Sequence, residues 1–120
     1  MFELAVDPTV SALRPMRRSL DAWLERTGVR ETPRASLVLA AHEAVANAIQ
    51  HARPTGPVHV TASGDAEDVV VSISDDGHWK TPDKEPAACG GLAMIEGLVS
   101  AVAVTTQDHG TTVVLRQFPP

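Results

Sequence analysis

The feature that most restricts the fold is a change of hydrophobic period near Pro54 and Gly56. Before it, two long segments place apolar residues three or four positions apart, as helices do; after it, apolar and polar residues alternate, as in strands. Two packed helices followed by a run of strands are typical of an α+β sandwich with one antiparallel sheet covered on one face. The strands are expected over residues 57–63, 68–74, 101–107 and 111–118.

The other elements follow from proline and glycine, which end helices and open turns. Residues 75–91 form a polar segment with several of both, and a loop of that length in a compact domain is often functional. The chain of 120 residues is expected to be a single domain, residues 1–120. The remaining expected elements are a strand over 2–6, a helix from about Pro15 to a stop at Gly28, a helix from Thr32 or Pro33 to before Pro54, and a short helix over 92–101.

Composition excludes several classes of function. The formal net charge of −5 argues against non-specific binding to nucleic acid, which requires phosphate neutralisation. One cysteine, Cys89, allows no internal disulfide and fits a reducing compartment. The N-terminus lacks the order of a secretory signal, and no apolar run approaches the ~18 residues of a membrane span. We therefore expect a soluble cytoplasmic protein without a membrane or direct nucleic-acid partner.

The second expected helix carries a polar row, Glu43, Asn47 and His51, at strict four-residue intervals. One interpretation is the solvated face of an ordinary amphipathic helix. The other is a site, because Asn47 offers a neutral amide oxygen suited to Mg²⁺ that keeps waters and phosphate ligands, and Glu43 could act as a general base. A zinc site is disfavoured, since His42 and His51 fall on different helix faces and the chain has a lone cysteine.

Three later motifs are weak when taken singly. "DDG" at residues 75–77 ends a buried-looking strand, and Asp-Gly is also a common turn. "GGL" at residues 90–92 opens a short helix, where free N–H groups can bind an anion. "GTTV" at residues 110–113 turns the chain into the last strand. Their order and separation, together with the polar helix, give them more weight than each has alone.

In this order the four motifs resemble the nucleotide-binding boxes of the GHKL ATPase family, whose Bergerat fold is shared by histidine kinases, gyrase and Hsp90. "EAVAN" looks like the N box, "DDG" and "GGL" like the two glycine boxes, and "GTTV" like the closing motif. The resemblance implies a two-layer sandwich with a mixed, mostly antiparallel sheet covered on one face by helices. It is closest to the small bacterial anti-sigma-factor kinases, which phosphorylate a serine or threonine on an anti-anti-sigma antagonist.

The resemblance implies ATP and Mg²⁺ as cofactors, with a sigma factor and a STAS-type antagonist as partners. It assigns roles residue by residue. Asn47 would carry the Mg²⁺ that bridges the phosphates, and Glu43 would activate the substrate hydroxyl. The other nucleotide contacts it implies are Asp75 at the adenine amino group, Gly77 beside the base, Thr111 in the same region, Gly90, Gly91 and Leu92 at the phosphates, and His51 either near phosphate or as a helix cap.

Two departures from the family pattern keep an alternative open. Trp79 and Cys89 stand where the boxes often have glycine, and the lid expected over residues 78–90 is short and contains Pro82 and Pro86. The alternative function is therefore a catalytically weak or inactive partner-switching module that acts by binding proteins only. A detached histidine kinase domain is disfavoured, because the chain has no room for a dimerisation and phosphoacceptor domain. A purely structural domain would have to treat four ordered motifs as coincidence.

The first expected helix carries Arg14, Arg17 and Arg18. These side chains could form a homodimer face or a partner face, as in similar proteins, or a plain solvated surface.

Overall fold

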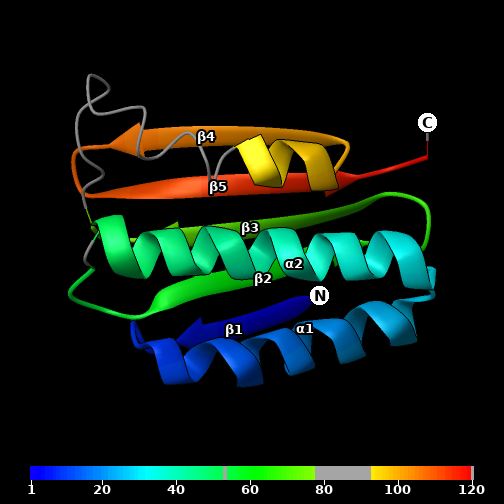
Figure 1. Ribbon diagram of the computed structural model, residues 1–120, viewed down its shortest axis with the longest axis horizontal. Coiled ribbons are helices and arrows are strands. Elements are labelled where there is room, and N and C mark those ends of the chain that lie inside the picture. Colours follow the sequence, from blue (N-terminus) through cyan, green and yellow to red (C-terminus); the bar gives the residue numbers. More distant parts are fainter. Residues whose placement is uncertain (53, 78–92, 120) are drawn as a thin grey trace.

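The computed structural model describes residues 1–52, 54–77 and 93–119. They form two layers, a five-stranded sheet and a layer of helices that covers one of its faces (Figure 1). The α+β sandwich expected from the sequence is thereby confirmed. The elements are β1 (Phe2–Val6), η1 (Val10–Ala12), α1 (Leu13–Thr27), α2 (Glu31–Asn47), η2 (Ala48–Ala52), β2 (Val58–Gly64), β3 (Val69–Asp75), a helix over residues 93–98, β4 (Ala101–Gln107) and β5 (Gly110–Gln117).

The strands lie in the order β1-β2-β3-β5-β4, and all four pairings among these described strands are antiparallel. Strand residues alternate between the buried, helix-facing side and the other side; Val69, Val71 and Ile73 of β3 are all buried. β3 and β5 run the full depth of the sheet in one register, from the pair Val69–Gln117 to the pair Asp75–Thr111. β3 and β5 therefore both extend from one end of the sheet to the other, and Asp75 and Thr111 lie together at one of these ends.

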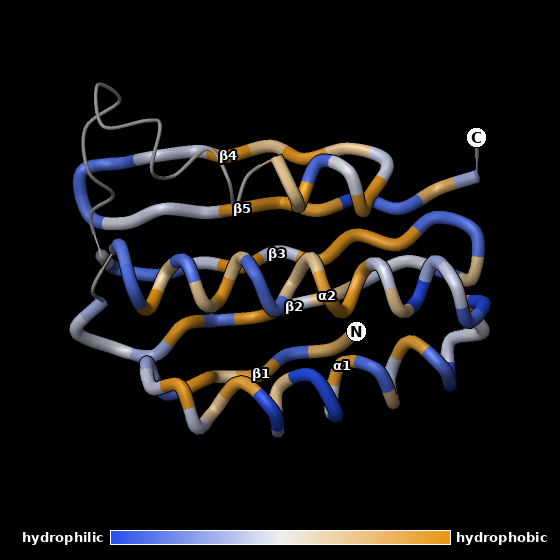
Figure 2. The backbone as a smooth tube through the Cα atoms, in the orientation of Figure 1, coloured by the Kyte–Doolittle hydropathy of each residue, from blue (hydrophilic) through white to orange (hydrophobic). Residues whose placement is uncertain are grey.

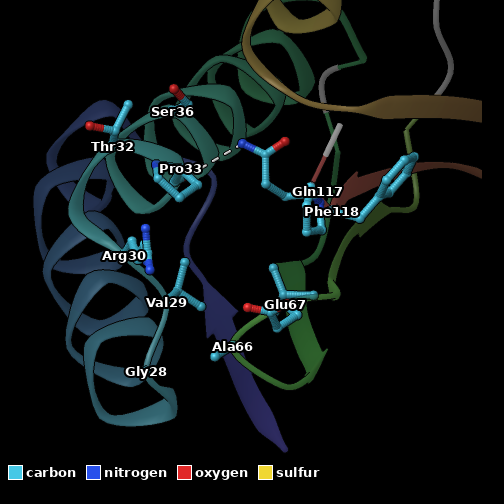
Figure 3. A pocket seen from close by; sticks show the side chains of 12 residues that line it. Gly28, Val29, Arg30, Thr32, Pro33, Ser36, Ala66, Glu67, Gln117 and Phe118 are labelled. Atoms are coloured by element: carbon cyan, nitrogen blue, oxygen red, sulfur yellow. Dashed lines mark hydrogen bonds between the residues drawn. The ribbon is translucent and has the colours of Figure 1, made fainter.

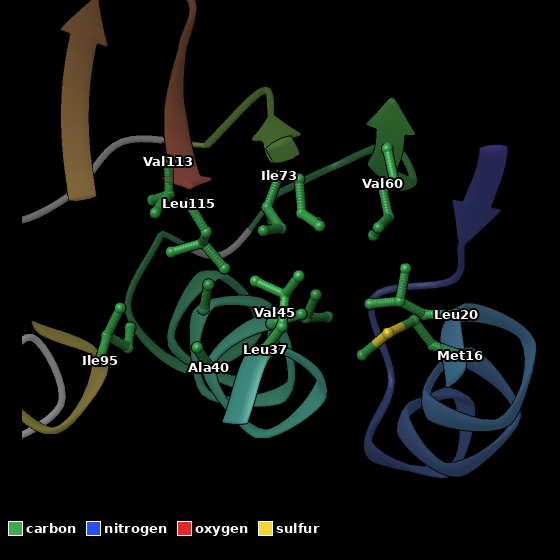
Figure 4. Packing of buried hydrophobic residues seen from close by; sticks show 14 of the residues in the cluster. Met16, Leu20, Leu37, Ala40, Val45, Val60, Ile73, Ile95, Val113 and Leu115 are labelled. Atoms are coloured by element: carbon green, nitrogen blue, oxygen red, sulfur yellow. The ribbon is translucent and has the colours of Figure 1, made fainter. Parts of the chain in front are cut away.

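α2 is the centre of the helical layer, and its buried residues contact α1, the 93–98 helix and the sheet. Figure 4 shows its Leu37, Ala40 and Val45 between Met16 and Leu20 of α1, Ile95 of the 93–98 helix, and the sheet residues Ile73 and Leu115. In Figure 2 the hydropathy alternates along α1, a helix with one covered side. Full burial of each large aliphatic side chain contributes about 1.5–3 kcal/mol, so this cluster holds the two layers together.

Both helices begin earlier than the sequence predicts. α1 starts at Leu13 and α2 at Glu31, each with a proline, Pro15 or Pro33, as its third residue. The first-turn N–H groups of a helix have no internal partner, so a proline there removes no hydrogen bond. The predicted stop at Gly28 is confirmed: Gly28 is the C-cap of α1, with the left-handed φ of 97° that glycine tolerates best.

Candidate functional site

The polar row of α2 does not lie on a fully solvated face. Asn47 is only 9% exposed, and Glu43 and His51 are half-buried. Ala40 and Ala44, which flank the row, are buried. Because these borders are small, neighbouring elements approach α2 closely and cover part of the row. Of the two interpretations left open by the sequence, the burial favours a site.

Glu43 and Asn47 border the same hollow, which has a volume of about 280 Å³. It lies between α2, the start of α1 and η1. A carboxylate and a carboxamide one helical turn apart therefore face one space. The other residues that line it are Val10, Leu13, His42, Ala46, Ile49 and Gln50.

The helix changes geometry directly after Asn47. The segment η2 is π-helical, with wider turns than an α-helix, and it contains His51. Single π turns of this kind occur often at functional sites. The sequence did not predict this change, since the 3.6-residue pattern of apolar residues continues through it. Asn47 thus stands at the junction of the two helix types.

A second group of predicted site residues lies where β3 ends and β5 begins. Asp75 pairs with Thr111 across the ladder. The Asp75 carboxylate accepts a hydrogen bond from the N–H of Gly77 (Oδ1 to N, 2.8 Å), and Gly77 is buried. Thr111 is 2% exposed, and within the described ranges its Oγ1 has no hydrogen-bond partner. A buried hydroxyl without a partner costs about 1–3 kcal/mol, which a bound polar ligand could recover.

Gly110 allows β5 to begin against the backbone of β3. A Cβ atom on this residue would collide with the carbonyl oxygen of Asp75 and press on the Cα of Asp76. Any other residue here would push apart the strand ends that carry Asp75 and Thr111. The sequence singled out the motif that starts at Gly110, but the steric reason for its glycine is visible only across the two strands.

Asp76, the second acid of "DDG", has a role that the sequence did not predict. Its carboxylate accepts hydrogen bonds from the Thr55 hydroxyl at 2.7 Å, the Thr55 N–H at 2.9 Å and the Gly56 N–H at 3.1 Å. These bonds, the Thr55 hydroxyl first, hold the pKa of Asp76 below its usual value. The turn before β2 is thereby tied to the end of β3. In the sequence, the one sign of this role of Asp76 is the Thr55-Gly56 pair just before β2.

The structure brings those predicted site residues that it describes to one end of the molecule, although they do not border one cavity. In Figure 1 the C-terminal end of α2 lies over the end of the sheet where β3 finishes and β5 starts. Asp75 borders a separate hollow of about 220 Å³, together with Asp76 and His59. Gly90, Gly91 and Leu92, like Trp79, Cys89 and the expected lid over residues 78–90, lie outside the described residues.

A larger hollow, of about 570 Å³, lies at the opposite end of α2 and of the sheet (Figure 3). Its lining includes Arg30 and Ser36 near the start of α2, Glu67 before β3, and Gln117 and Phe118 at the end of β5. None of the predicted site residues borders it. This hollow therefore lies apart from the candidate site.

The donor set at Asn47 limits what could bind there. Within residues 1–52, 54–77 and 93–119, no group of three or more His, Cys, Asp or Glu side chains could hold a metal ion. A cation at Asn47 would therefore need ligands from water or a bound anion, which is the usual habit of Mg²⁺. No helix in the same ranges is long and apolar enough to cross a membrane.

The comparison with protein families identifies this arrangement. A family described as the histidine kinase-like ATPase domain matches residues 6–117, nearly the whole chain. The chain belongs to the histidine kinase-like ATPase family. The GHKL resemblance noted in the sequence is therefore confirmed. The segment that resembles the N box lies in α2, and the one that resembles the first glycine box lies at the end of β3.

Two solved structures are similar to this ATPase domain. One contains the RsbU and RsbW domains of Rv1364c from Mycobacterium tuberculosis, with a TM-score of 0.81 and 29% identity over 98% of this chain. The chain spans only 32% of that protein's length. The other is the Acinetobacter baumannii histidine kinase AdeS, with a TM-score of 0.58 and 11% identity, covering 98% of this chain and 68% of the other. The second similarity shows the fold alone.

Proposed function

We propose that this chain is an ATP-binding regulatory serine/threonine-protein kinase that acts as an anti-sigma factor. It would phosphorylate an anti-anti-sigma antagonist of the STAS type and sequester a sigma factor. The observation that carries the proposal is the shared hollow of Glu43 and the nearly buried Asn47, at the end of the molecule where Asp75 and Thr111 meet. Family membership and the sequence resemblance to anti-sigma-factor kinases support it.

The residues fit the nucleotide in two places. Asn47 would hold Mg²⁺ through its amide oxygen, with the remaining ligands from phosphates and water. At the other place, the Asp75 carboxylate would accept a hydrogen bond from the adenine amino group, and the Thr111 hydroxyl would gain the partner it lacks. Bound ATP supplies the phosphoryl group, and Mg²⁺ neutralises part of its charge.

Glu43 acts in the proposed mechanism as the general base. Its half-buried carboxylate, one turn before Asn47, borders the space from which an acceptor hydroxyl would approach the phosphates. It would take the hydroxyl proton as the bond between the acceptor oxygen and the γ-phosphorus forms and the bond from that phosphorus to the bridging oxygen breaks, with ADP as the leaving group. Because phosphoryl transfer needs little covalent help, positioning by α2 and charge neutralisation would supply most of the catalysis.

Smaller roles complete the proposed site. Gly77 would leave room beside the base, and His51 in η2 would lie near phosphate. Gly90, Gly91 and Leu92 would contact the phosphates through the backbone. The exposed Arg14 and Arg18 of α1 offer a cationic surface for a protein partner or a second copy of the chain.

Calorimetry with ATP and Mg²⁺ tests the nucleotide site, and transfer of radiolabelled phosphate to a STAS-type antagonist tests the kinase. We expect a binding heat that requires Mg²⁺, followed by phosphoserine or phosphothreonine on the antagonist. A well-folded chain that gives no heat at millimolar ATP would contradict the proposal. A pull-down from the native host, with and without ATP, tests the partners; recovery of neither a sigma factor nor a small antagonist would count against the anti-sigma role.

A further inference from the structure

A hydrogen bond between α1 and α2 determines which ring nitrogen of His42 carries a proton. The Arg17 guanidinium Nη1 lies 2.9 Å from His42 Nδ1. A guanidinium can only donate, so Nδ1 must be the acceptor and carries no hydrogen. A neutral imidazole with a bare Nδ1 has its hydrogen on Nε2. Arg17 therefore leaves His42 with one N–H donor, on the ring nitrogen that does not face Arg17.

The surroundings of His42 keep the ring neutral. Burial and the Arg17 charge lower the pKa of His42 from its usual 6.5, and the neighbouring Glu43 opposes them. Arg17 is the charged group that reaches the ring from α1, Glu43 is the one on α2, and η1 has no titratable side chain. At neutral pH the ring is thus an N–H donor without a charge.

His42 and Glu43 border the same 280 Å³ hollow, whose remaining walls are mainly apolar. Val10, which also lines the hollow, is 69% exposed, so one of the hollow's aliphatic side chains is open to contact with a partner. The negative charge of Glu43 would repel an acidic segment in this hollow. A segment with aliphatic side chains beside the hydroxyl would instead cover Val10, Leu13 and Ile49.

We propose that this hollow receives the acceptor segment of the substrate protein and that His42 is a positioning residue, donating its Nε2–H to a backbone carbonyl of that segment. The segment carries a serine or threonine next to an aliphatic residue. The inference rests on the proposed kinase function and adds to it the chemistry of the acceptor. Neither the N-box motif nor the spacing of the polar row pointed to His42.

The state of the His42 ring is measurable without any substrate. Nitrogen-15 NMR of the histidine rings, with His42 assigned by comparison with His42→Gln, should show the Nε2–H form at pH 7. The variant Arg17→Met keeps much of the apolar stem of the side chain but has no donor and no charge, and it should raise the titration midpoint of His42. An Nδ1–H ring or a charged imidazolium in the wild-type chain would overturn the proposal.

Steady-state transfer tests the acceptor role. The probes are purified STAS-type antagonists encoded in the genome that carries this chain. His42→Ala should raise the acceptor KM about fivefold, the worth of one neutral hydrogen bond, and His42→Gln, which keeps an N–H donor, should restore most of it. Val10→Asp should raise the acceptor KM as well. The exposed α1 variant Ser19→Ala is the matched control and should behave as wild type.

The outcomes separate this inference from the proposed function. Asn47 borders the same hollow, but in this proposal His42 and Val10 contact the acceptor alone, so ATP affinity should be the same in all of these variants. A loss of ATP affinity in His42→Ala or Val10→Asp would overturn the proposal. Transfer that proceeds with an unchanged acceptor KM in His42→Ala would overturn the acceptor role and leave the kinase intact. Normal ATP binding with no transfer to any antagonist would contradict the kinase function, and the acceptor site with it.

Discussion

Asp75 and Thr111 lie opposite each other in the ladder between β3 and β5, and their side chains differ in hydrogen bonding. Asp75 accepts the Gly77 N–H, whereas the Thr111 hydroxyl is buried and has no partner within the described ranges. The strand end thus combines a carboxylate acceptor with a hydroxyl that lacks its hydrogen bond. Such a pair suits a ligand that carries both donors and acceptors, as adenine does.

Replacing Thr111 by valine should move stability and affinity in opposite directions. Thr111→Val keeps the shape of the side chain and removes the unpaired hydroxyl. Without ligand, the free energy of unfolding should rise by about 1 kcal/mol, while affinity for MgATP should fall. Urea denaturation and calorimetry measure the two quantities. A less stable variant would show that the hydroxyl does have a partner.

The close approach at Gly110 predicts a strong effect of one methyl group. Gly110→Ala places a Cβ against the Asp75 carbonyl, and backbone atoms on both strands would have to move. The unfolding free energy should fall by about 1–3 kcal/mol, and nucleotide affinity should fall with it. Gly97→Ala is the matched control, since a Cβ at Gly97 would meet nothing within 4 Å. Equal stability of the two variants would contradict the steric argument.

Substitutions of Asn47 and Glu43, both in α2, should affect different steps: the first ATP binding, the second phosphoryl transfer. Asn47→Ala should abolish the heat of Mg²⁺-dependent ATP binding, because it removes the amide ligand. Glu43→Ala should retain ATP affinity and lose phosphoryl transfer, because it removes the general base. Circular dichroism of both variants is the control, since Asn47 is nearly buried. Normal MgATP binding by Asn47→Ala would remove the central residue of the proposal.

Asp76 should make stability depend on pH in acid. Its folded-state pKa is lowered from 3.8 by the hydrogen bonds from Thr55 and Gly56. Stability from a lowered carboxyl pKa is complete above the unfolded value and is lost as pH falls through the folded one. The stability difference between wild type and Asp76→Ala should therefore be constant from pH 7 to about pH 5 and shrink below pH 3.8.

Urea denaturation at pH 7 and at pH 3 measures this effect of Asp76. Asp108→Ala, in the exposed turn between β4 and β5, controls for the loss of one surface carboxylate. A wild-type advantage over Asp76→Ala that is as large at pH 3 as at pH 7 would argue against the pKa shift.

Much of the fold was predictable because it depends on local pattern. The change from a helical to an alternating period separated the helices from the strands, and Gly28 ended α1 where predicted. The predicted helix starts, Pro15 for α1 and Thr32 or Pro33 for α2, lie one or two residues after the observed ones, Leu13 and Glu31. First-turn positions tolerate proline equally well, and sequence alone does not rank them.

Part of the candidate site was likewise predictable from the sequence, and part was not. Glu43, Asn47, Asp75 and Thr111 were identified by residue type and spacing, which the sequence displays directly. The close contact at Gly110, the Thr55–Asp76 hydrogen bonds and the Arg17–His42 pair join residues 21 to 35 positions apart. No local pattern encodes such contacts, because they depend on which elements become neighbours.

The amino-acid sequence by itself determined the order of elements, the family and the residues that could perform chemistry, since periodicity and motif are properties of the chain. Only the tertiary structure decided that the polar row of α2 is partly buried rather than solvated. Burial depends on the helix and the sheet that pack against α2. Ala40 and Ala44 allow this close packing, but alanines also occur on solvent-exposed helix faces, so the sequence does not show whether the face is buried. The structure likewise decided the ring state of His42, because Arg17 reaches it from another helix.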